Sequence, residues 1–518
     1  MSSAITLDSV LAISPEIGLV ILAVLVLFFD RAVKPSERRS LGLLTAWGGL
    51  IILLGTVALW FFFDQPSTEP IMYWGGMIRQ DLVTLVFRVM FLIALVITAL
   101  LSLDFKNVQS GEYYALLLTA TVGFSLMAAS SDLIMLYVAL ETASLSLYVL
   151  AAYTKGVSRS NEAGMKYFIY GAFASAVMLF GLSYMYGLTG ETNIYEIFPT
   201  LRATGAPDAT ILVAAAMVIV GFGFKISAVP YHFWAPDVYE GAPTPITGLI
   251  STASKAAGFA VFLRVFTAGV FGEPERSNAW WAMLVAMCIV TMTLGNLLAI
   301  RQKNIKRMLA YSSIAQAGYA MIGLITALTV LATSPENLET GLDGAGATMF
   351  FLLYYVITNV AAFGVIIMVS NITGSDEIQD LAGLSRRSPW MALAMLFALL
   401  SLGGIPPTAG FFGKFFIFRA AIEAPVETTM FGVTFQGGLW WLAAIGIFNA
   451  FIALYYYLSV AKVMYLYRSE DEDVKVPMSR AAGVALGFTI FAILYLGIFA
   501  NSAFEWTREA ATAFFRLG

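Results

Sequence analysis

The sequence predicts an all-α polytopic membrane protein, and three observations lead to that fold class. Of the 518 residues, 59% are hydrophobic and only 12% are charged, whereas a soluble domain has roughly 25% charged residues. The mean hydropathy is +0.81. The apolar stretches are about 20 residues long, which suits membrane-spanning helices rather than barrel strands of about ten alternating residues. The chain is therefore expected to cross a bilayer many times as helices.

Apolar runs bounded by glycine, proline and charged residues predict about 14 transmembrane helices. Two longer stretches between them, 331–346 and 371–389, are predicted to be loops, with a short surface helix as an alternative in the second. The predicted spans are 14–30, 41–63, 82–103, 113–129, 131–153, 163–188, 209–229, 244–270, 279–300, 306–330, 347–370, 390–418, 437–466 and 481–503.

Positive charge alternates between the loops of this arrangement. Lysine and arginine gather after spans 1, 5, 9, 11 and 13, and are scarce in the other loops. Positively charged loops stay cytoplasmic, so both termini are expected on the outer side. The N-terminus has no positively charged region before its first apolar run, so it is expected to be a retained anchor rather than a signal peptide. The clustered cations are Arg31, Lys34, Arg38, Arg39, Lys155, Arg159, Arg301, Lys303, Lys306, Arg307, Arg386, Arg387, Arg468, Lys475 and Arg480.

The composition excludes several classes of function. The chain has one cysteine, Cys288, and one histidine, His232, whereas iron–sulfur clusters and structural zinc sites normally need four ligands of these types. No G-x-G-x-x-G follows a strand and no P-loop is present. The net charge is −4 without a basic block, so nucleic acid is not an expected partner. Uphill ion movement would therefore need energy from a partner or from another gradient.

Two predicted spans are interrupted next to a lysine. Pro230 breaks span 7 shortly after Lys225, and Pro406 and Pro407 break span 12 before Lys414. Such breaks are tolerated in membranes where they border protein or a water-filled cavity. Paired broken helices suggest two five-span repeats, spans 4–8 and 9–13, which must be inverted because five is odd. The predicted organisation is 1–112 for helices 1–3, 113–270 for the first repeat, 271–470 for the second, and 471–518 for helix 14 and a short tail.

Four ionisable residues lie inside apolar sequence: Glu141, Lys225, Lys255 and Lys414. A charge at such a depth costs between ~3 and more than 10 kcal/mol, and it usually pairs or marks an ion path. Glu141 is expected to be the only carboxylate clearly inside a span, so it is the expected partner of Lys225. Alternation between a paired and a separated state would let Lys225 hold and release a proton. The alternative is a static ion pair that specifies helix packing.

Lys255 and Lys414 have no equally evident partner in the sequence, which favours a relay through water and hydroxyl groups. Ser251, Thr252 and Ser254 precede Lys255 and could order such water. Capping or packing between helices is an equally open interpretation of these hydroxyls.

The remaining polar residues near spans have less specific surroundings. Lys166 is expected from its position to reach the positively charged surface. His232 follows the break in span 7 and is the one side chain with an unperturbed pKa near neutrality, although a satisfied polar residue is an equal alternative. Asp237 is expected at a helix end. Arg88 and Arg264 fall near span ends and are expected to snorkel.

Four segments resemble the antiporter-like subunits of respiratory complex I, and among these the subunit N (subunit 2) type. They read LETASLSLYVLAAYTKGVSRSNEAGMKYFIYGAFASA, PYHFWAPDVYEGAPTPITGLISTASKAAGFAVFLRVF, RQKNIKRMLAYSSIAQAGY and GGIPPTAGFFGKFFIF. The likeness runs from roughly residue 110 to 465. The chain has no long lateral helix after span 14, which disfavours the subunit L type.

The resemblance implies a fold with 14 helices, inverted five-helix repeats and broken helices 7 and 12. It also implies a proton half-channel with Glu141 and Lys225 at its centre. Lysines of helices 8 and 12 carry the relay onward in this family. The residues that match family positions are Glu141, Lys166, Lys225, His232, Lys255 and Lys414, so the resemblance implies a role for Lys166 and His232 as well.

The same resemblance implies that this chain holds no cofactor and carries protons for a proton-pumping NADH-quinone oxidoreductase. FMN, iron–sulfur clusters and quinone are then expected in partner subunits. The expected partners are a sister antiporter-like subunit, small membrane subunits and the lipid bilayer, in a hetero-oligomer in the bacterial cytoplasmic membrane. The alternative is a subunit of a multisubunit cation/proton antiporter. A purely structural scaffold would leave the buried charges unexplained.

Overall fold

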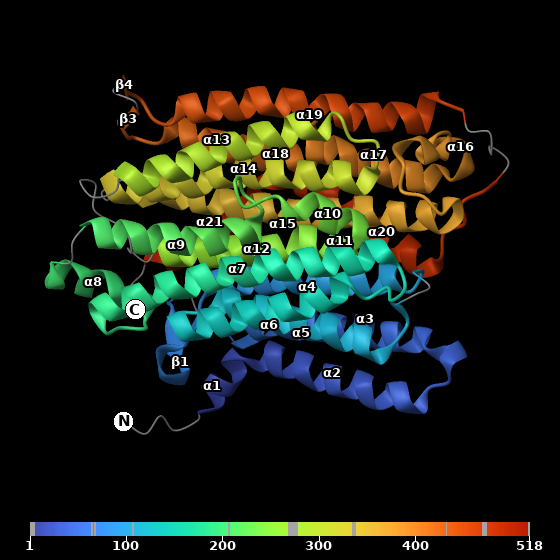
Figure 1. Ribbon diagram of the computed structural model, residues 1–518, viewed down its shortest axis with the longest axis horizontal. Helices are drawn as coiled ribbons and strands as arrows, with labels where there is room; N and C mark the ends of the chain where they lie inside the picture. The colour runs from blue at the N-terminus through green and yellow to red at the C-terminus, as the bar shows by residue number, and fades with distance from the viewer. Residues whose placement is uncertain are drawn as a thin grey trace.

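The helices of the chain lie side by side in one bundle with their axes roughly parallel (Figure 1). The computed structural model describes residues 6–515 except 64, 65, 67, 68, 106, 107, 206, 207, 268–277, 334–337, 431, 432 and 469–473. Helices dominate because backbone groups inside a bilayer must find their hydrogen bonds within the segment itself.

The first half of the chain contains twelve α-helices, three other helical turns and one β-hairpin. They are α1 (Leu7–Ala12), α2 (Ser14–Ala32), η1 (Pro35–Glu37), α3 (Arg39–Phe63), β1 (Ile71–Tyr73), η2 (Trp74–Gly76), β2 (Ile78–Gln80), α4 (Leu82–Ser102), α5 (Gly111–Ala129), α6 (Leu133–Ala151), α7 (Ser158–Thr189), α8 (Ile194–Thr204), α9 (Asp208–Ile226), α10 (Trp234–Gly241), α11 (Thr244–Leu249), η4 (Ile250–Ser254) and α12 (Lys255–Val265), as far as the described residues extend.

The second half continues in the same way, with one further hairpin. Its described elements are α13 (Asn278–Ala299), α14 (Ile305–Thr333), α15 (Leu338–Thr373), η7 (Ile378–Leu381), α16 (Leu384–Arg387), α17 (Pro389–Gly403), α18 (Ala409–Glu423), β3 (Thr428–Met430), β4 (Val433–Phe435), α19 (Trp440–Leu466), α20 (Arg480–Ile498) and α21 (Ala500–Phe515).

The predicted polytopic helical fold is confirmed. Within the described residues, twelve helical segments are long and apolar enough to cross a membrane. The 19-residue α2 carries charged residues near both ends, and α17 and α18 are each 15 residues long on either side of a break. Together with α2 and this broken pair, the twelve segments correspond to the 14 predicted spans.

Both predicted interruptions are present. Span 7 stops at Ile226, and the chain resumes as the short α10 at Trp234. Span 12 stops at Gly403 and resumes at Ala409. Span 8 holds a third irregularity that the sequence did not indicate, because η4 is a π-helical turn between α11 and α12.

The predicted loop over 331–346 is wrong for 331–333 and 338–346, which are helical, and its residues 334–337 lie outside the described residues. Helix α14 continues to Thr333, and α15 already begins at Leu338. In the sequence, glycines in this stretch indicate boundaries between spans, but in the structure they lie inside a helix and allow close helix packing. A Cβ atom on Gly344 would lie 2.8 Å from the main-chain nitrogen of Ala327 on α14. Small residues at such contacts let membrane helices approach each other. In the other predicted loop, 371–389, η7 and α16 confirm the short-helix alternative.

The two ends of the bundle differ in their surface elements. The hairpin β1–β2, α8 and the hairpin β3–β4 lie at one end, and α16 lies at the other (Figure 1). Helix α15 and the combined helix α11–η4–α12 are enclosed by other helices, whereas α3 is mostly exposed at the side of the bundle. Lys255, the first residue of α12, therefore lies on a helix that is itself enclosed.

Candidate functional site

Lys225 lies on α9, one residue before the helix ends at the break, and its side chain is only 3% exposed. Its ammonium group donates a hydrogen bond to Ser144 Oγ on α6 at 3.0 Å. No ion pair joins Lys225 to Glu141 in the described part of the chain, and Glu141 Oε1 has no hydrogen-bond partner there. The expected direct pair is thus not formed in this structure, and alternation between the two states stays a prediction.

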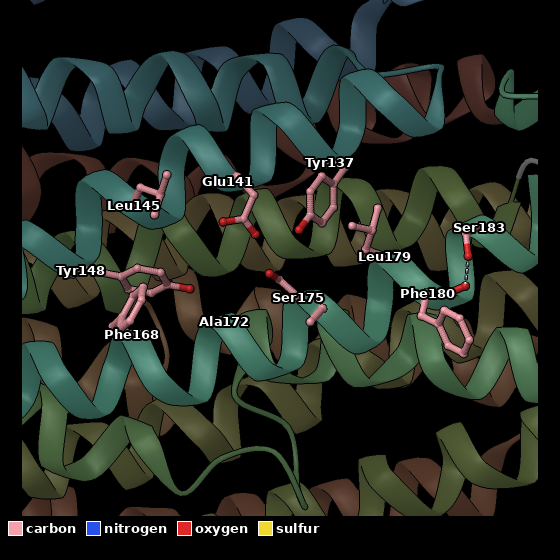
Figure 2. A pocket seen from close by; sticks show the side chains of 11 residues that line it. Tyr137, Glu141, Leu145, Tyr148, Phe168, Ala172, Ser175, Leu179, Phe180 and Ser183 are labelled. Atoms are coloured by element: carbon pink, nitrogen blue, oxygen red, sulfur yellow. Dashed lines mark hydrogen bonds between the residues drawn. The ribbon is translucent and has the colours of Figure 1, made fainter.

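Glu141 instead faces a pocket of about 550 Å³ between α6 and α7. Figure 2 shows its carboxylate directed across this pocket toward Ser175 on α7, with Tyr137 and Tyr148 on either side. The rest of the lining is largely apolar. A carboxylate at membrane depth needs a cation, a hydrogen-bond donor or water, and this pocket is the space beside Glu141 where such a partner would have to lie.

A second, smaller cavity lies beside Lys225. It measures about 10 Å³ and is lined by Lys225, Ser144, Tyr148 and Ser175, among others. Such a volume is close to the minimum that one water molecule needs. Tyr148 and Ser175 line both this cavity and the Glu141 pocket. These two side chains therefore form the layer that separates the carboxylate from the ammonium group.

Lys255 is the first residue of α12, directly after the π-helical turn, and is 2% exposed. Its Nζ donates to the main-chain oxygen of Ser313 on α14 at 2.6 Å. Gly258, one turn further along α12, lies against Lys225, because a Cβ atom there would be 3.1 Å from Lys225 Cγ. The Lys225 side chain thus packs one helical turn from Lys255. Single π-helical turns are frequent at functional sites.

Lys414 lies on α18 and reaches back across the break to the end of α17. Its Nζ donates to the carbonyl oxygens of Leu402 at 2.8 Å and Gly403 at 3.1 Å. The last carbonyls of a helix lack partners in the helix and form the negative end of its dipole, so they suit a cation. Gly404 takes a φ of +83° to end α17 at this point. The ring of Tyr319 lies 5.0 Å from the same ammonium group.

Polar side chains of α14 continue from the Lys414 site. Gln316 Nε2 donates to the same Leu402 oxygen at 3.0 Å and to the Tyr457 hydroxyl at 3.2 Å. Tyr457 shares a further hydrogen bond with the hydroxyl of Ser312. Gln316 therefore links the carbonyl that binds Lys414 to Ser312, one turn away on the same helix.

Ser313, the neighbour of Ser312, connects this network to Lys255. Its main-chain oxygen accepts from Lys255, and its hydroxyl accepts from Tyr355 at 2.8 Å. Asn359 donates to the Tyr355 hydroxyl at 3.0 Å. A line of hydrogen-bonded groups thus extends from Lys255 to Lys414, with one step along the backbone between two adjacent serines.

The hydroxyl groups that precede Lys255 are expected from the sequence either to order water or to serve helix packing, and the structure shows one of each kind. Thr252 donates to the Gly248 carbonyl of its own helix at 2.7 Å, which agrees with packing. Ser251 also accepts from Asn359 at 2.9 Å and so joins the polar network. Sequence reasoning missed most of this network. Three members, all within YSSIAQAGY, lie inside an apolar span, and their spacing could have indicated one polar helix face. The missed residues are Ser144, Ser312, Ser313, Gln316, Tyr355, Asn359 and Tyr457.

Lys166 lies apart from Lys225, Lys255 and Lys414. Its side chain is 37% exposed and forms ion pairs with Glu162 and Asp237, each at 2.6 Å. Asp237 also pairs with Arg307 at 2.6 Å, and Arg307 with Glu240 at 3.1 Å. This cluster resembles the surface placement expected from position alone, and a role in the relay stays a prediction.

His232 lies in the connection between α9 and α10 and is 6% exposed. Its Nδ1 is buried without a hydrogen-bond partner among the described residues. No hydrogen bond joins it to Lys225 within this part of the chain. The structure therefore places His232 at the break, as expected, but no hydrogen bond among the described residues connects it to Lys225, Lys255 or Lys414, which are called the lysine line below.

The expectation that Arg88 and Arg264 snorkel is wrong. Arg88 is 4% exposed and pairs with Glu16 on α2 at 2.8 Å, with a further hydrogen bond to Ser125. Glu16 is thus a second buried carboxylate inside a span. The helices bring opposite charges together in the interior, which replaces solvation at the surface.

Arg264 is 1% exposed and binds both carboxylate oxygens of Asp81 at 2.8 Å. Arg79 donates to the same carboxylate at 3.1 Å, and Thr84 donates to it from its hydroxyl and its main-chain nitrogen. Burial alone would raise the pKa of Asp81, but the Arg264 and Arg79 guanidinium groups outweigh this effect and lower the pKa to about 2. The cluster ties the start of α4 to α12.

Fourteen spans, two broken helices and a buried line of lysines define the class of antiporter-like membrane proteins. The family model described as "NADH:quinone oxidoreductase/Mrp antiporter, TM" matches residues 130–452, which include every lysine of the line and Glu141. Relatives that are 40% identical over 90% or more of this chain are named NADH-quinone oxidoreductase subunit N, and the chain belongs to that family.

The relatives that show this family cover nearly the whole chain. NADH-quinone oxidoreductase subunit N of Moorella thermoacetica is 40% identical over 93% of this chain and 94% of its own length. A chain of respiratory complex I from Thermus thermophilus with bound aureothin is 30% identical, with a TM-score of 0.75 over 95% of this chain and 98% of that one. A chain of the Mrp complex from Dietzia sp. shares the fold alone, with 21% identity and a TM-score of 0.77 over 98% and 97%.

Proposed function

We propose that this chain is a proton-translocating membrane subunit of a complex I-type NADH-quinone oxidoreductase. The names of its relatives support this assignment. The observation that carries it is the buried line of hydrogen-bonded groups from Lys255 to Lys414. Partner subunits hold FMN, iron–sulfur clusters and the quinone site, and this chain supplies a proton path without redox chemistry of its own. The assembly also includes a sister antiporter-like subunit and small membrane subunits.

The first step takes place between Glu141 and Lys225. Their separation by Tyr148 and Ser175 corresponds to the open state of the switch. When a signal from a neighbouring subunit brings the carboxylate and the ammonium group together, the charged form of Lys225 is favoured. When they separate, burial disfavours that charge, and Lys225 releases its proton.

The second step carries the proton toward Lys414. The Lys225 side chain packs one turn from Lys255, which is bound to Ser313. The α14 hydroxyl and amide groups then lead to the end of α17, where the helix dipole stabilises the cation on Lys414. Release follows on the outer side. A part for Lys166 and His232 in this path is proposed from the family resemblance alone.

The division into two inverted repeats, 113–270 and 271–470, belongs to the same proposal. Each repeat contains one broken helix with a lysine beside the break. The orientation with both termini outside the bacterial cytoplasmic membrane follows from the loop charges.

A subunit of a cation/proton antiporter remains the second candidate, because the Mrp chain shares the fold. Purification of the tagged chain from its native membrane separates the two. We expect mass spectrometry to find iron–sulfur and flavin subunits that co-elute in equal amounts. Recovery of small membrane subunits alone would favour the antiporter.

Replacement of Gln316 by leucine tests the relay itself. The variant has a similar volume but leaves the Leu402 carbonyl and the Tyr457 hydroxyl without their shared donor. The Leu402 carbonyl and the Tyr457 hydroxyl keep Lys414 and Ser312 as partners, but the link between them is lost. A hydrogen bond contributes about 0.5–1.5 kcal/mol, so we expect proton translocation through this chain to fall by up to about tenfold. The measurement is the number of protons pumped per electron pair in proteoliposomes. Gln302→Leu, which removes an amide at the surface, is the matched control. Equal pumping by both variants would contradict the proposed path.

A further inference from the structure

A groove on the side of the bundle lies away from the lysine line. It measures about 430 Å³ and is formed by α3, α4 and α20. Helices α3 and α20 both pack against α4, so α4 forms the floor and the other two form the walls. The lining is apolar, from Leu43 and Leu53 on α3 to Phe488 on α20, with one exception. That exception is Arg480, the first residue of α20.

The groove has the length of one leaflet of a bilayer. Its lining covers 43–53 on α3, 93–100 on α4 and 480–488 on α20. At 1.5 Å per residue these segments rise about 11–15 Å, which is half of a hydrocarbon core of about 30 Å. A transmembrane helix of a partner would need the full thickness. An acyl chain of one lipid needs only this half.

Arg480 lies at one end of the groove, and among the described residues no anion is bound to it. Its side chain is exposed and makes no hydrogen bond or ion pair with any described residue. The nearby cation Arg39 is already paired with Asp104 at 3.0 Å, and the hydroxyl of Ser479 donates to the same carboxylate. Guanidinium groups recognise phosphate through paired hydrogen bonds. The one unpaired charge of the groove therefore lies where a lipid headgroup would sit.

We propose that this groove binds one anionic phospholipid of the leaflet on the Arg480 side. One acyl chain lies on α4 between α3 and α20, and the phosphate binds Arg480. The bound lipid fills the space between the N-terminal helix α3 and the C-terminal helix α20, and so joins the two ends of the chain at that face.

The test uses the whole complex in nanodiscs with phosphatidylglycerol that carries a photoreactive group on its acyl chain. We expect labelled peptides from α3, α4 and α20, and weaker labelling by the matching phosphatidylcholine. An arginine near the membrane surface contributes about fivefold to the binding of an anionic lipid, so Arg480→Gln should lower phosphatidylglycerol labelling about fivefold. Arg301→Gln removes another exposed arginine, which has no ion pair within the described part of the chain, from a positively charged loop, and should have no effect.

A second variant tests the apolar part of the groove. Val484 lines the groove and is 65% exposed, so Val484→Trp fills the space without disturbing the core and should block labelling by both lipids. Val24→Trp on α2, at a position with 60% exposure, is the control. Three results would overturn the proposal: no labelling of the groove peptides, as when a partner subunit covers them; equal labelling by both lipids; or phosphatidylglycerol labelling that Arg480→Gln leaves unchanged.

Discussion

Replacement of Lys225 by methionine is expected to stop proton translocation through this chain while the complex still assembles. Methionine fills a similar space but cannot carry a proton, and the loss of a proton-transferring group costs about 10²–10⁴-fold in rate. Lys225 is enclosed and held by Ser144, so no bulk water is at hand to replace it. The measurement is the number of protons pumped per electron pair in proteoliposomes, with assembly checked by native gel.

The Lys225→Arg variant tests whether residue 225 must release its proton or needs only to carry a positive charge. Arginine keeps the positive charge but does not release its proton near neutral pH, so this variant should also fail to pump. Lys155→Met, at an exposed lysine in a loop, is the control and should pump normally. An unchanged proton ratio in Lys225→Met would refute the relay. Recovery by Lys225→Arg would favour a static cation that specifies helix packing.

Replacement of Asp81 by leucine is expected to have the largest effect on stability. The change removes the carboxylate that Arg264 and Arg79 share in the interior. Breaking a buried ion pair by removing one partner costs about 3–5 kcal/mol, because a buried charge loses its compensation. We expect a lower yield of assembled complex and a lower midpoint of thermal inactivation.

Two controls define the cause of that loss. Glu423→Leu removes an exposed pair with Arg419, which should cost no more than about 1 kcal/mol. Asp81→Leu combined with Arg264→Met should recover part of the stability, because the uncompensated charge is also removed. Full stability of Asp81→Leu alone would show that the cluster does not support the fold.

The same cluster predicts a dependence of stability on pH. The pKa of Asp81 is lowered to about 2 in the folded chain, whereas an unperturbed aspartate has a pKa of about 3.9. A lowered folded pKa stabilises the fold above the unfolded value, and this contribution disappears as the pH falls from about 4 toward 2. Asp81→Asn should therefore flatten the loss of stability over this range, as measured by the midpoint of thermal inactivation.

Much of the fold was accessible from the sequence because the bilayer restricts the choices. Spans of about 20 apolar residues, alternating loop charge and paired prolines near Lys225 and Lys414 predicted the helices and both breaks. The error at 331–346 had a local cause. Glycine has a low helix propensity and is common in loops, but it also occurs inside helices where two helices pack closely. Only the contact between Gly344 and Ala327 in the folded chain shows that the second case applies here.

The sequence by itself determined the membrane fold class and the depth of Glu141, Lys225, Lys255 and Lys414, because hydropathy and length depend on neighbours along the chain. Only the tertiary structure decided what these groups bind. Lys225 binds Ser144 rather than Glu141, and Lys414 binds the end of α17. Arg264 binds Asp81, which lies 183 residues earlier in the sequence. Hydrogen bonds and ion pairs act over a few ångströms in space, so their partners are defined by helix packing and not by sequence distance.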